Sequence, residues 1–451
     1  MGKQMAYQGI TQFFSDNQDI TQLVVGVFDY NGVLRGKRMP IAKLSSLLNS
    51  GFKMPLSIIQ TDIWGRDIEG SSLLFETGDA DAQITLINRA PLRLSWLAEP
   101  TALLIGSFVD DEGAPLALCP RGRLATMQAR FAAQSQAICA GVEMEFYLLS
   151  DDSPSPAASL ATNVTAPSGD TLSVHQLDDY DKLFAEINRI CEAQGIGLDT
   201  ITSELGRGQF EITFAPKEDL VRLADDILIF KYLIKGLAKA HGIRASFMAK
   251  PLQGEAGNGL HVHASLIDET GQNLFHDEMA DGAKLLHHAV AGILRYMNAS
   301  CLILAPYMNS YRRLVPSSHA PTKICWGVDN RSASVRIPAS EPAQRRLEYR
   351  SAGADCQPYL LLAILAYAMA EGIARGFDAP EPVTGNAYDH DYDALPAEMS
   401  EAMRHYEGSE AMRQALGETL HSYYLATKLQ EWTAFAEHVS AFEYDSLSHA
   451  I

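Results

Sequence analysis

Several short runs rich in apolar and β-branched residues, separated by polar and turn-forming residues, lie near the start of the chain, and this pattern is typical of β-strands. The runs at residues 23–29, 34–39, 83–87 and 101–109 predict a small sheet. Asn31 and Gly32 lie between the first two runs, and this residue pair favours a hairpin turn. With a short helix over residues 8–20, these elements predict a sheet-rich N-terminal domain over residues 1–112.

Helical spacing, with apolar residues three and four positions apart, dominates the rest of the chain. The spacing predicts helices over residues 123–137, 179–194, 218–241, 278–300 and 355–375, and a largely helical C-terminal tail. Residues 150–170 are rich in Ser, Pro and Asp and predict a loop. Strand-like runs occur between these helices, so we expect an α+β protein with a second, larger domain over residues 113–451.

One of these later strands carries two acids on the same face. In the run GVEMEFYLL at residues 141–149, Glu143 and Glu145 alternate with apolar residues. Two neighbouring carboxylates repel each other, and removing them from water costs further free energy. The pattern therefore predicts that positive charge neutralises this face of the strand.

Three further stretches carry acids or histidines in apolar surroundings: SELGRGQFEITF at 203–214, GNGLHVHASL at 257–266 and RRLEYR at 345–350. Taken singly, such patterns are typical of solvated strand faces or surface ion pairs. Together they supply five carboxylates and a histidine, which are suitable ligands for Mg²⁺ or Mn²⁺. The residues are Glu143, Glu145, Glu204, Glu211, Glu348 and His261. Two such ions would neutralise the acidic strand.

Arginines accompany these acids and indicate an anionic substrate. They occur in SYRRLVP at residues 310–316, NRSASVRIP at 330–338 and RRLEYR at 345–350, where Arg331 and Arg336 are expected to flank a short strand. A guanidinium group binds carboxylate or phosphate through two parallel hydrogen bonds. Divalent cations and arginines together are the usual apparatus of phosphoryl transfer. The chain has no GxxxxGK[ST] motif, which argues against a P-loop enzyme.

The composition of the chain argues against some classes of binding partner. The chain has 451 residues, of which 36 are Lys or Arg and 55 are Asp or Glu, so its net charge of −19 argues against nucleic acid or an anionic membrane as a partner. The six cysteines form no CxxC pair, and we expect scattered thiols in a reducing cytoplasm. No apolar run approaches the ~20 residues that span a bilayer, and the first residues lack an apolar leader.

These motifs, in this order and over nearly the whole chain, resemble the glutamine synthetase family. The resemblance implies a β-grasp-like N-terminal domain and a catalytic domain built on an antiparallel sheet with surrounding helices. It also implies a homo-hexameric or homo-dodecameric ring with active sites between subunits. The reaction that it implies is phosphorylation of the γ-carboxylate of L-glutamate by ATP, followed by displacement of phosphate by an uncharged nitrogen nucleophile.

The resemblance also implies a role for individual residues. Glu145, Glu204 and Glu211 would bind one divalent cation, and Glu143, His261 and Glu348 the other; His263, Ser265 and Arg346 would lie near ATP; Arg313 and Gly257 would bind glutamate; Arg350 would lie at the glutamyl and phosphate end; Arg331 and Arg336 would handle phosphate; and Asp29 would reach the ammonium site of a neighbouring subunit.

The sequence departs from the family pattern at the nucleophile. Ammonia-using members carry a glutamate six residues beyond the arginine of SYxRLVP, and this chain has His319 there. Ala256 also replaces the asparagine that the family places before GxGxH. Intact metal and phosphate motifs beside an altered ammonium site favour a γ-glutamyl-amine ligase that uses a primary amine.

Three alternatives remain open at this point. The first is an ordinary glutamine synthetase in which His319 is a loop variant, and the second is a catalytically inactive homologue. The third is a phosphotransferase of the related guanidino-kinase architecture. Trp64 is as consistent with an apolar lining for the amine as with an ordinary core position.

Overall fold

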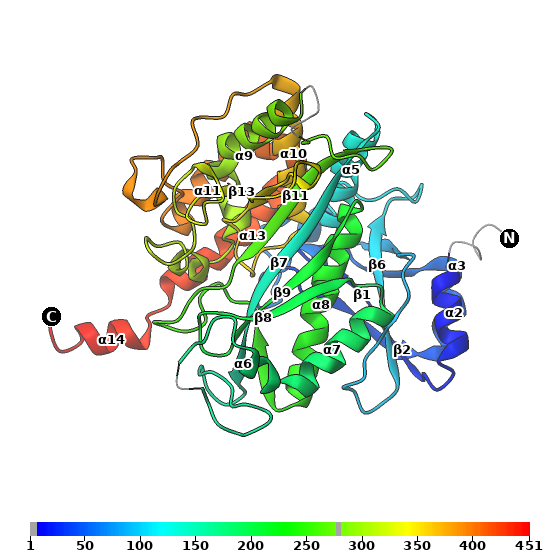
Figure 1. The fold of residues 1–451 in the computed structure, drawn as a ribbon. Coiled ribbons are helices and arrows are strands. Elements are labelled where there is room, and N and C mark those ends of the chain that lie inside the picture. The colour runs from blue at the N-terminus through cyan, green and yellow to red at the C-terminus, as the bar shows by residue number, and fades with distance from the viewer. Residues whose placement is uncertain (1–6, 167, 277–280) are drawn as a thin grey trace.

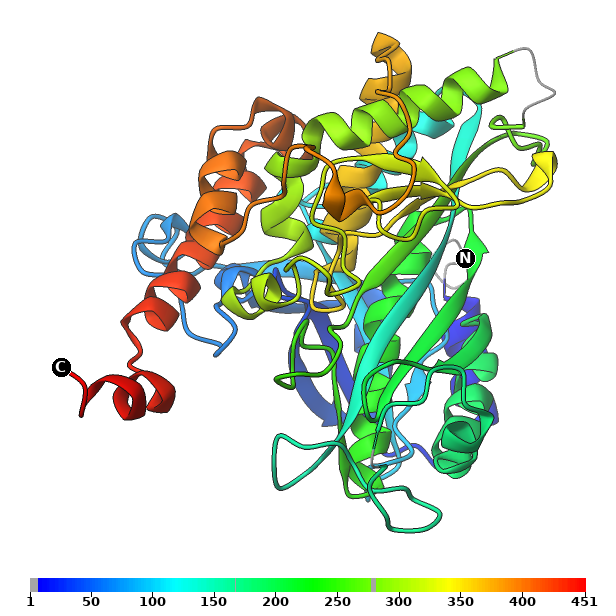
Figure 2. The same ribbon diagram turned by 60° about the vertical axis from the view of Figure 1, so that its left-hand side comes forward.

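The structure is a computed structural model that describes residues 7–166, 168–276 and 281–451 (Figures 1 and 2). Long strands cross the middle of the molecule, and helices surround them. The N-terminal sheet lies at one side, and the C-terminal helix α14 projects from the body in both views.

The N-terminal sheet has, within the described residues, the strand order β2-β1-β6-β4-β3, with β5 beside β6. Its strands are β1 (Gln22–Phe28), β2 (Leu34–Pro40), β3 (Phe52–Pro55), β4 (Asp81–Leu86), β5 (Leu92–Arg93) and β6 (Thr101–Val109). β1 runs parallel to β6, whose nine residues are all buried, so β6 forms the centre of the sheet. The predicted strands and the turn between β1 and β2 are confirmed, and Gly32 supplies the positive φ of 69° that this turn requires.

Short helices border this sheet. They are α2 (Gln8–Asp16), α3 (Leu44–Ser50), α4 (Ser72–Phe75) and the 3₁₀ turns η1 (Ile41–Lys43) and η2 (Leu56–Gln60). The predicted helix over 8–20 ends early at Asp16, because Thr21 and Gln22 already donate hydrogen bonds to the carbonyl of Pro100 beside β6.

The second sheet has, in the described part of the chain, the order β12-β13-β14-β11-β7-β9-β8, with β10 also paired to β7. Its strands are β7 (Gln136–Ser150), β8 (Leu198–Ser203), β9 (Gln209–Lys217), β10 (Ile243–Ser246), β11 (Leu260–Asp268), β12 (Trp326–Val328), β13 (Val335–Ile337) and β14 (Leu347–Tyr349). Its described pairs are antiparallel except β12 with β13. The predicted helix over 123–137 is wrong at its end, because α5 stops at Ala132 and β7 begins at Gln136.

Helices cover this sheet. The main ones are α5 (Pro120–Ala132), α7 (Asp181–Ala193), α8 (Leu220–Ala240), α9 (Gly282–Leu304) and α10 (Pro358–Arg375), which lie close to the predicted ranges. The predicted start of α9 at residue 278 lies outside the described residues. Among the described helices, α10 alone is long and apolar enough to cross a membrane, yet 72% of it is buried inside the protein, as in a core helix. Apart from Ser150, which ends β7, the described residues of the predicted loop over 150–170 belong to no helix or strand.

Four short elements lie between these helices and strands: α6 (Val174–Asp178), η3 (Met308–Arg312), η4 (Pro342–Gln344) and η5 (Ala387–Asp389).

The C-terminal tail is helical, as predicted, and one of its helices returns to the N-terminal sheet. Its helices are α11 (Met399–Glu407), α12 (Glu410–Leu416), α13 (Glu418–Glu437) and α14 (Ala441–Leu447). α13 packs on η2, and one continuous apolar core joins the residues of both sheets. The domain boundary near residue 112, between β6 and α5, stays a prediction.

Candidate active site

Strand register brings the predicted metal ligands together on the second sheet. His261 on β11 lies opposite Glu143 on β7, and Glu145 lies opposite Glu211 on β9. Glu348 on β14 lies opposite His263. Directly opposed residues of an antiparallel pair point to the same face. Residues far apart in the sequence therefore share one acidic face of the sheet.

Two groups of ligand atoms on this face are close enough to hold a cation. The ligand atoms of Glu143, His261 and Glu348 all lie within 4.8 Å of one another, and so do those of Glu145, Glu211 and His261. The first group has the same members as one predicted ligand set. The second contains His261 in place of Glu204, which lies in the turn after β8.

Two histidine rings neutralise part of this face. Glu143 forms hydrogen bonds with His261 Nδ1 at 3.2 Å and with His263 Nε2 at 2.8 Å. Burial alone would raise the pKa of Glu143, but the two histidine hydrogen bonds outweigh it and hold the pKa below its ordinary value. Glu143 is therefore a carboxylate in the folded protein.

Within the described residues, Glu204 and Glu211, which lie toward β8 and β9, form no hydrogen bond with a histidine. Burial, followed by the charge of Glu145, raises the pKa of Glu204 to about 7. Burial, followed by the charges of Glu143 and Glu145, raises the pKa of Glu211 to about 9. Carboxylates with imidazole are a suitable donor set for Mg²⁺ or Mn²⁺, and a divalent cation would relieve this repulsion. The residues of this face therefore fit divalent cations.

Arginines line the edge of this face beside Glu348. Arg336 donates to Glu348 at 2.9 Å and also pairs with Asp329 at 2.5 Å, and Arg350 donates to the other oxygen of Glu348. Arg336 lies within β13, so the prediction that it flanks this strand is wrong, whereas Arg331 precedes the strand and is exposed. Burial raises the pKa of Glu348, but nearby positive charge, above all that of Arg350, outweighs this effect and holds the pKa below its ordinary value.

Arg313 is 4% exposed and lies directly after η3. Its guanidinium donates to the carbonyl oxygens of Ser351 at 3.0 Å and Arg350 at 3.3 Å. Gly257 and Gly259 pack against it so closely that a Cβ at either position would lie 2.8 Å from an Arg313 atom. These glycines allow the backbone to approach the arginine, which predicts that neither tolerates a side chain.

Two of the residues predicted to lie near ATP, His263 and Ser265, lie on β11, and the third, Arg346, directly precedes β14. His261, His263 and Ser265 alternate along β11 and therefore share a face. Arg346 Nε donates to His263 Nδ1 at 3.3 Å. The hydroxyl of Ser265 donates to the carbonyl of Cys139 at 3.5 Å. Their roles toward a nucleotide stay a prediction.

Asp29 lies at the turn between β1 and β2. Its side chain is fully buried at the turn between β1 and β2, where it accepts hydrogen bonds from the amides of Asn31 and Val33 and pairs with Arg35 at 2.8 Å. Burial raises the pKa of Asp29 to about 6, although Arg35 opposes the shift. Its oxygens therefore hold this turn, and its role at the ammonium site of a neighbouring subunit stays a prediction.

His319 lies in the exposed loop that follows Arg313. Its backbone has a φ of 65°, in the left-handed region, and the loop at 314–320 contains no acid. Ser318 donates to the carbonyl of Arg313 at 2.7 Å and so ties this loop to the arginine. Trp64 is 48% exposed and contacts Phe435, so it is not an ordinary core residue.

Sequence reasoning missed two residues, Gln209 and Asn258, that hold the loop of Gly257 and Gly259 in place. Gln209 Nε2 donates to the carbonyl of Gly257 at 2.9 Å and to Asn258 Oδ1 at 3.0 Å, and Asn258 donates to the carbonyl of Met248 at 2.8 Å. Both amides are buried. The only sequence signal was a pair of polar residues, each next to an apolar strand run.

Known proteins match this arrangement over most of the chain. The glutamine synthetase catalytic domain matches residues 117–447. The chain belongs to the glutamine synthetase family. It is 30% identical to the γ-glutamylputrescine synthetase PuuA of Escherichia coli (strain K12) over 420 residues, which cover 92% of this chain and 89% of that protein. It is 31% identical to the glutamine synthetase of Pyrococcus abyssi (strain GE5 / Orsay) over 422 residues, which cover 92% and 90%.

Solved structures share the fold. A structure described as a GmaS/ADP complex has a TM-score of 0.83 and 24% identity, and the match covers 97% of this chain and 99% of that chain. A structure described as a novel glutamine synthase homolog has a TM-score of 0.80. The glutamine synthetase family uses ATP and divalent metal ions, and this chain is an ATP-dependent carbon–nitrogen ligase of that family.

Proposed function

We propose that this member of the glutamine synthetase family joins the γ-carboxylate of L-glutamate to a primary amine, with ATP and two divalent cations. A γ-glutamyl phosphate would be the intermediate, because phosphorylation converts a carboxylate oxygen into a good leaving group. We also propose that the chain acts in the cytoplasm as a homo-hexameric or homo-dodecameric ring with active sites between subunits.

The observation that carries the choice of nucleophile is the acid-free loop after Arg313. Ammonium binds best where carboxylates surround it and accept its proton. The loop at 314–320 offers His319 in place of an acid, and the carboxylate of Asp29 is engaged in its own turn. The relative PuuA is named for ligation of an amine, whereas the Pyrococcus relative is named for glutamine synthesis at similar identity.

The acidic face of the second sheet would bind the two cations. Glu143, His261 and Glu348 would hold one, and Glu145 and Glu211, with Glu204 nearby, the other. When bound, divalent cations polarise phosphoryl oxygens and offset their negative charge. Arg336 and Arg350 flank Glu348 and would hold phosphate oxygens together with Arg331. His263, Ser265 and Arg346 would orient the nucleotide.

Arg313 and Gly257 would bind glutamate. The Arg313 guanidinium is rigidly placed, because two backbone carbonyls accept its hydrogen bonds and two glycines pack on it. A buried and pre-oriented guanidinium loses little entropy when it binds a carboxylate.

The function is tested by phosphate release from ATP in the presence of L-glutamate. The purified protein is given ammonium or one of a panel of diamines, aliphatic amines and aromatic amines. Release that depends on glutamate and on at least one primary amine supports the proposal. Release with ammonium alone identifies an ordinary glutamine synthetase, and the absence of release with any nucleophile contradicts a ligase.

We expect Arg313→Ala to raise the KM for glutamate by about one to two orders of magnitude, because a charge-assisted hydrogen bond contributes roughly 1.5–3 kcal/mol. The KM for ATP should change little. Steady-state kinetics with each substrate varied in turn measure both values. Arg312→Ala is the matched control, because Arg312 is the exposed neighbour. A glutamate KM that stays at the wild-type value in Arg313→Ala would show that Arg313 does not bind this substrate.

A further inference from the structure

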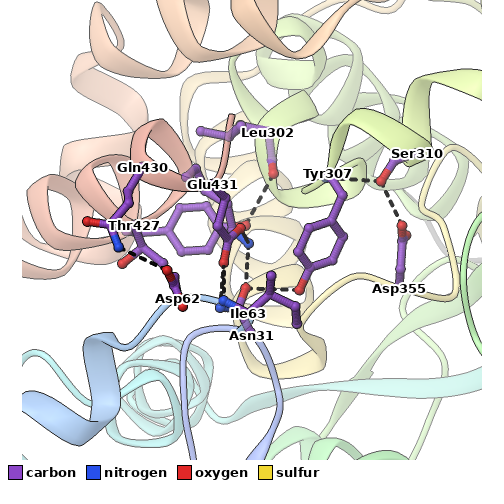
Figure 3. A network of polar contacts seen from close by, with 12 residues as sticks. Asn31, Asp62, Ile63, Leu302, Tyr307, Ser310, Asp355, Thr427, Gln430 and Glu431 are labelled. Carbon is purple, nitrogen blue, oxygen red and sulfur yellow. Dashed lines mark hydrogen bonds and ion pairs between the residues drawn. The ribbon is translucent and has the colours of Figure 1, made fainter. Parts of the chain in front are cut away.

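A lysine is completely buried where α13 meets the N-terminal sheet. Lys428 Nζ donates to Asn31 Oδ1 at 2.5 Å and to Glu431 Oε2 at 2.9 Å, and it lies 4.1 Å from the centre of the Tyr307 ring. Figure 3 shows the network around Asn31, Tyr307 and Glu431. Three segments distant in the sequence therefore meet at one buried charge.

The partners of this lysine are themselves bound to more than one segment. Glu431 Oε1 accepts from Asn31 Nδ2 and from the amide of Ile63, both at 2.8 Å. The Tyr307 hydroxyl donates to Asn31 Oδ1 at 2.9 Å. Asn31 thus joins the N-terminal turn to α13 and to Tyr307, and the hydroxyl of Tyr307 has one defined direction.

Stability alone is a poor reason for such a network. A buried ion pair is often no more stabilising than apolar residues of the same volume, because both charges lose their hydration. Fully satisfied buried polar groups do, however, restrict neighbouring side chains to one arrangement. The position of Tyr307 is the feature that this network restricts.

Tyr307 lies immediately before η3, and Arg313 lies immediately after it. The amide of Tyr307 donates to Ser310 Oγ at 3.0 Å, and Ser310 Oγ donates to Asp355 Oδ2 at 2.6 Å (Figure 3). The amide of Arg313 donates to the carbonyl of Ser310 at 3.1 Å. Hydrogen bonds to the hydroxyl and amide of Tyr307, and to the side chain and carbonyl of Ser310, therefore connect the buried lysine to the backbone of Arg313.

We propose that Tyr307, held by Asn31, Lys428 and Glu431, is a positioning residue for Arg313, so that α13 and the N-terminal turn govern glutamate binding. Tyr307 would not touch the substrate. The hydrogen bond of its hydroxyl fixes the start of η3, and η3 in turn fixes the position of Arg313 in the glutamate site. This inference rests on the proposed role of Arg313 in binding glutamate.

The test is Tyr307→Phe, which removes the hydroxyl and keeps the ring beside Lys428. A single hydrogen bond of this kind corresponds to roughly a three- to tenfold rise in the KM for glutamate. The KM for ATP and the melting temperature should stay close to the wild-type values. Tyr424→Phe is the matched control, because the buried Tyr424 hydroxyl donates to the carbonyl of Leu302 at 3.2 Å and does not bind Asn31.

The outcome is compared with that of Arg313→Ala. A rise in glutamate KM in Tyr307→Phe, absent from Tyr424→Phe, supports positioning. An unchanged glutamate KM in Tyr307→Phe, equal changes for both substrates, or equal effects of both tyrosine variants overturns it. If Arg313→Ala raises the glutamate KM and Tyr307→Phe does not, only this inference fails. If Arg313→Ala has no effect, the proposed glutamate site fails as well.

Discussion

Glu145→Gln is expected to slow ATP-dependent ligation by orders of magnitude and leave the fold intact. Glutamine has the same shape, and its carbonyl oxygen can still accept the hydrogen bond that the Gly259 amide makes to Glu145 at 2.5 Å. The charge that would help to hold a divalent cation with Glu211 and His261 is lost. A bound cation contributes several kcal/mol to stabilising transition-state charge, so its loss should slow turnover on the order of 100- to 1,000-fold.

Two measurements check this expectation. Phosphate release gives turnover at saturating Mg²⁺, and Mn²⁺ titration followed by electron paramagnetic resonance gives the number of tightly bound ions. The wild type should bind two ions and the variant should lose one. Glu371→Gln is the control, because Glu371 is a buried acid on α10 that pairs with Arg130 and Arg375. Turnover and two-ion binding preserved in Glu145→Gln would rule out a metal-binding role for this carboxylate.

His319→Glu is expected to shift the preferred nucleophile from a primary amine toward ammonia. A carboxylate at this position would attract ammonium and accept its proton. An amine instead gains about 0.8 kcal/mol for each CH₂ group that it buries, so five buried carbons would contribute about 4 kcal/mol. That energy corresponds to nearly three orders of magnitude in kcat/KM if it persists in the transition state.

The wild type should therefore prefer at least one primary amine to ammonia by more than ~100-fold in kcat/KM. In His319→Glu this ratio should fall by about tenfold or more, because an exposed charge interaction is worth about 1 kcal/mol and grows in a desolvated site. His319→Gln is the matched control, since it has the same positive φ to adopt and adds no charge. Equal ratios in the Glu and Gln variants would show that charge at residue 319 does not select the nucleophile.

Local patterns were sufficient to predict most of the elements. The apolar run over 101–109 coincides with β6, and the two acids of the GVEMEFYLL run lie on β7 as expected. The end of α5 was not predictable in this way, because Gln136 and Ala137 suit a helix as well as a strand. Their pairing with Asp268 and Ile267 of β11 decides the outcome, and such long-range pairing leaves no local trace.

The candidate site was predictable in its chemistry but not in its geometry. Acid and histidine patterns indicated the ligands, yet the sharing of His261 between two groups follows from strand register. The burial of Asp29 was not predictable, because a turn acid looks exposed in sequence, whereas Arg35 and two amides enclose it. Lys428 was missed for a similar reason, since a lysine on a helix usually faces solvent and its partner Asn31 lies 397 positions away.

The most direct test of the proposed function is a competition between nucleophiles. The protein is incubated with ATP, Mg²⁺, L-glutamate, ¹⁵N-ammonium and the best amine of the panel at equal concentrations, and the products are separated by mass spectrometry. We expect the γ-glutamyl amide of the amine to exceed ¹⁵N-glutamine by more than ~100-fold, as the buried carbon skeleton of the amine requires. A mixture dominated by ¹⁵N-glutamine would contradict the account and identify the chain as an ordinary glutamine synthetase.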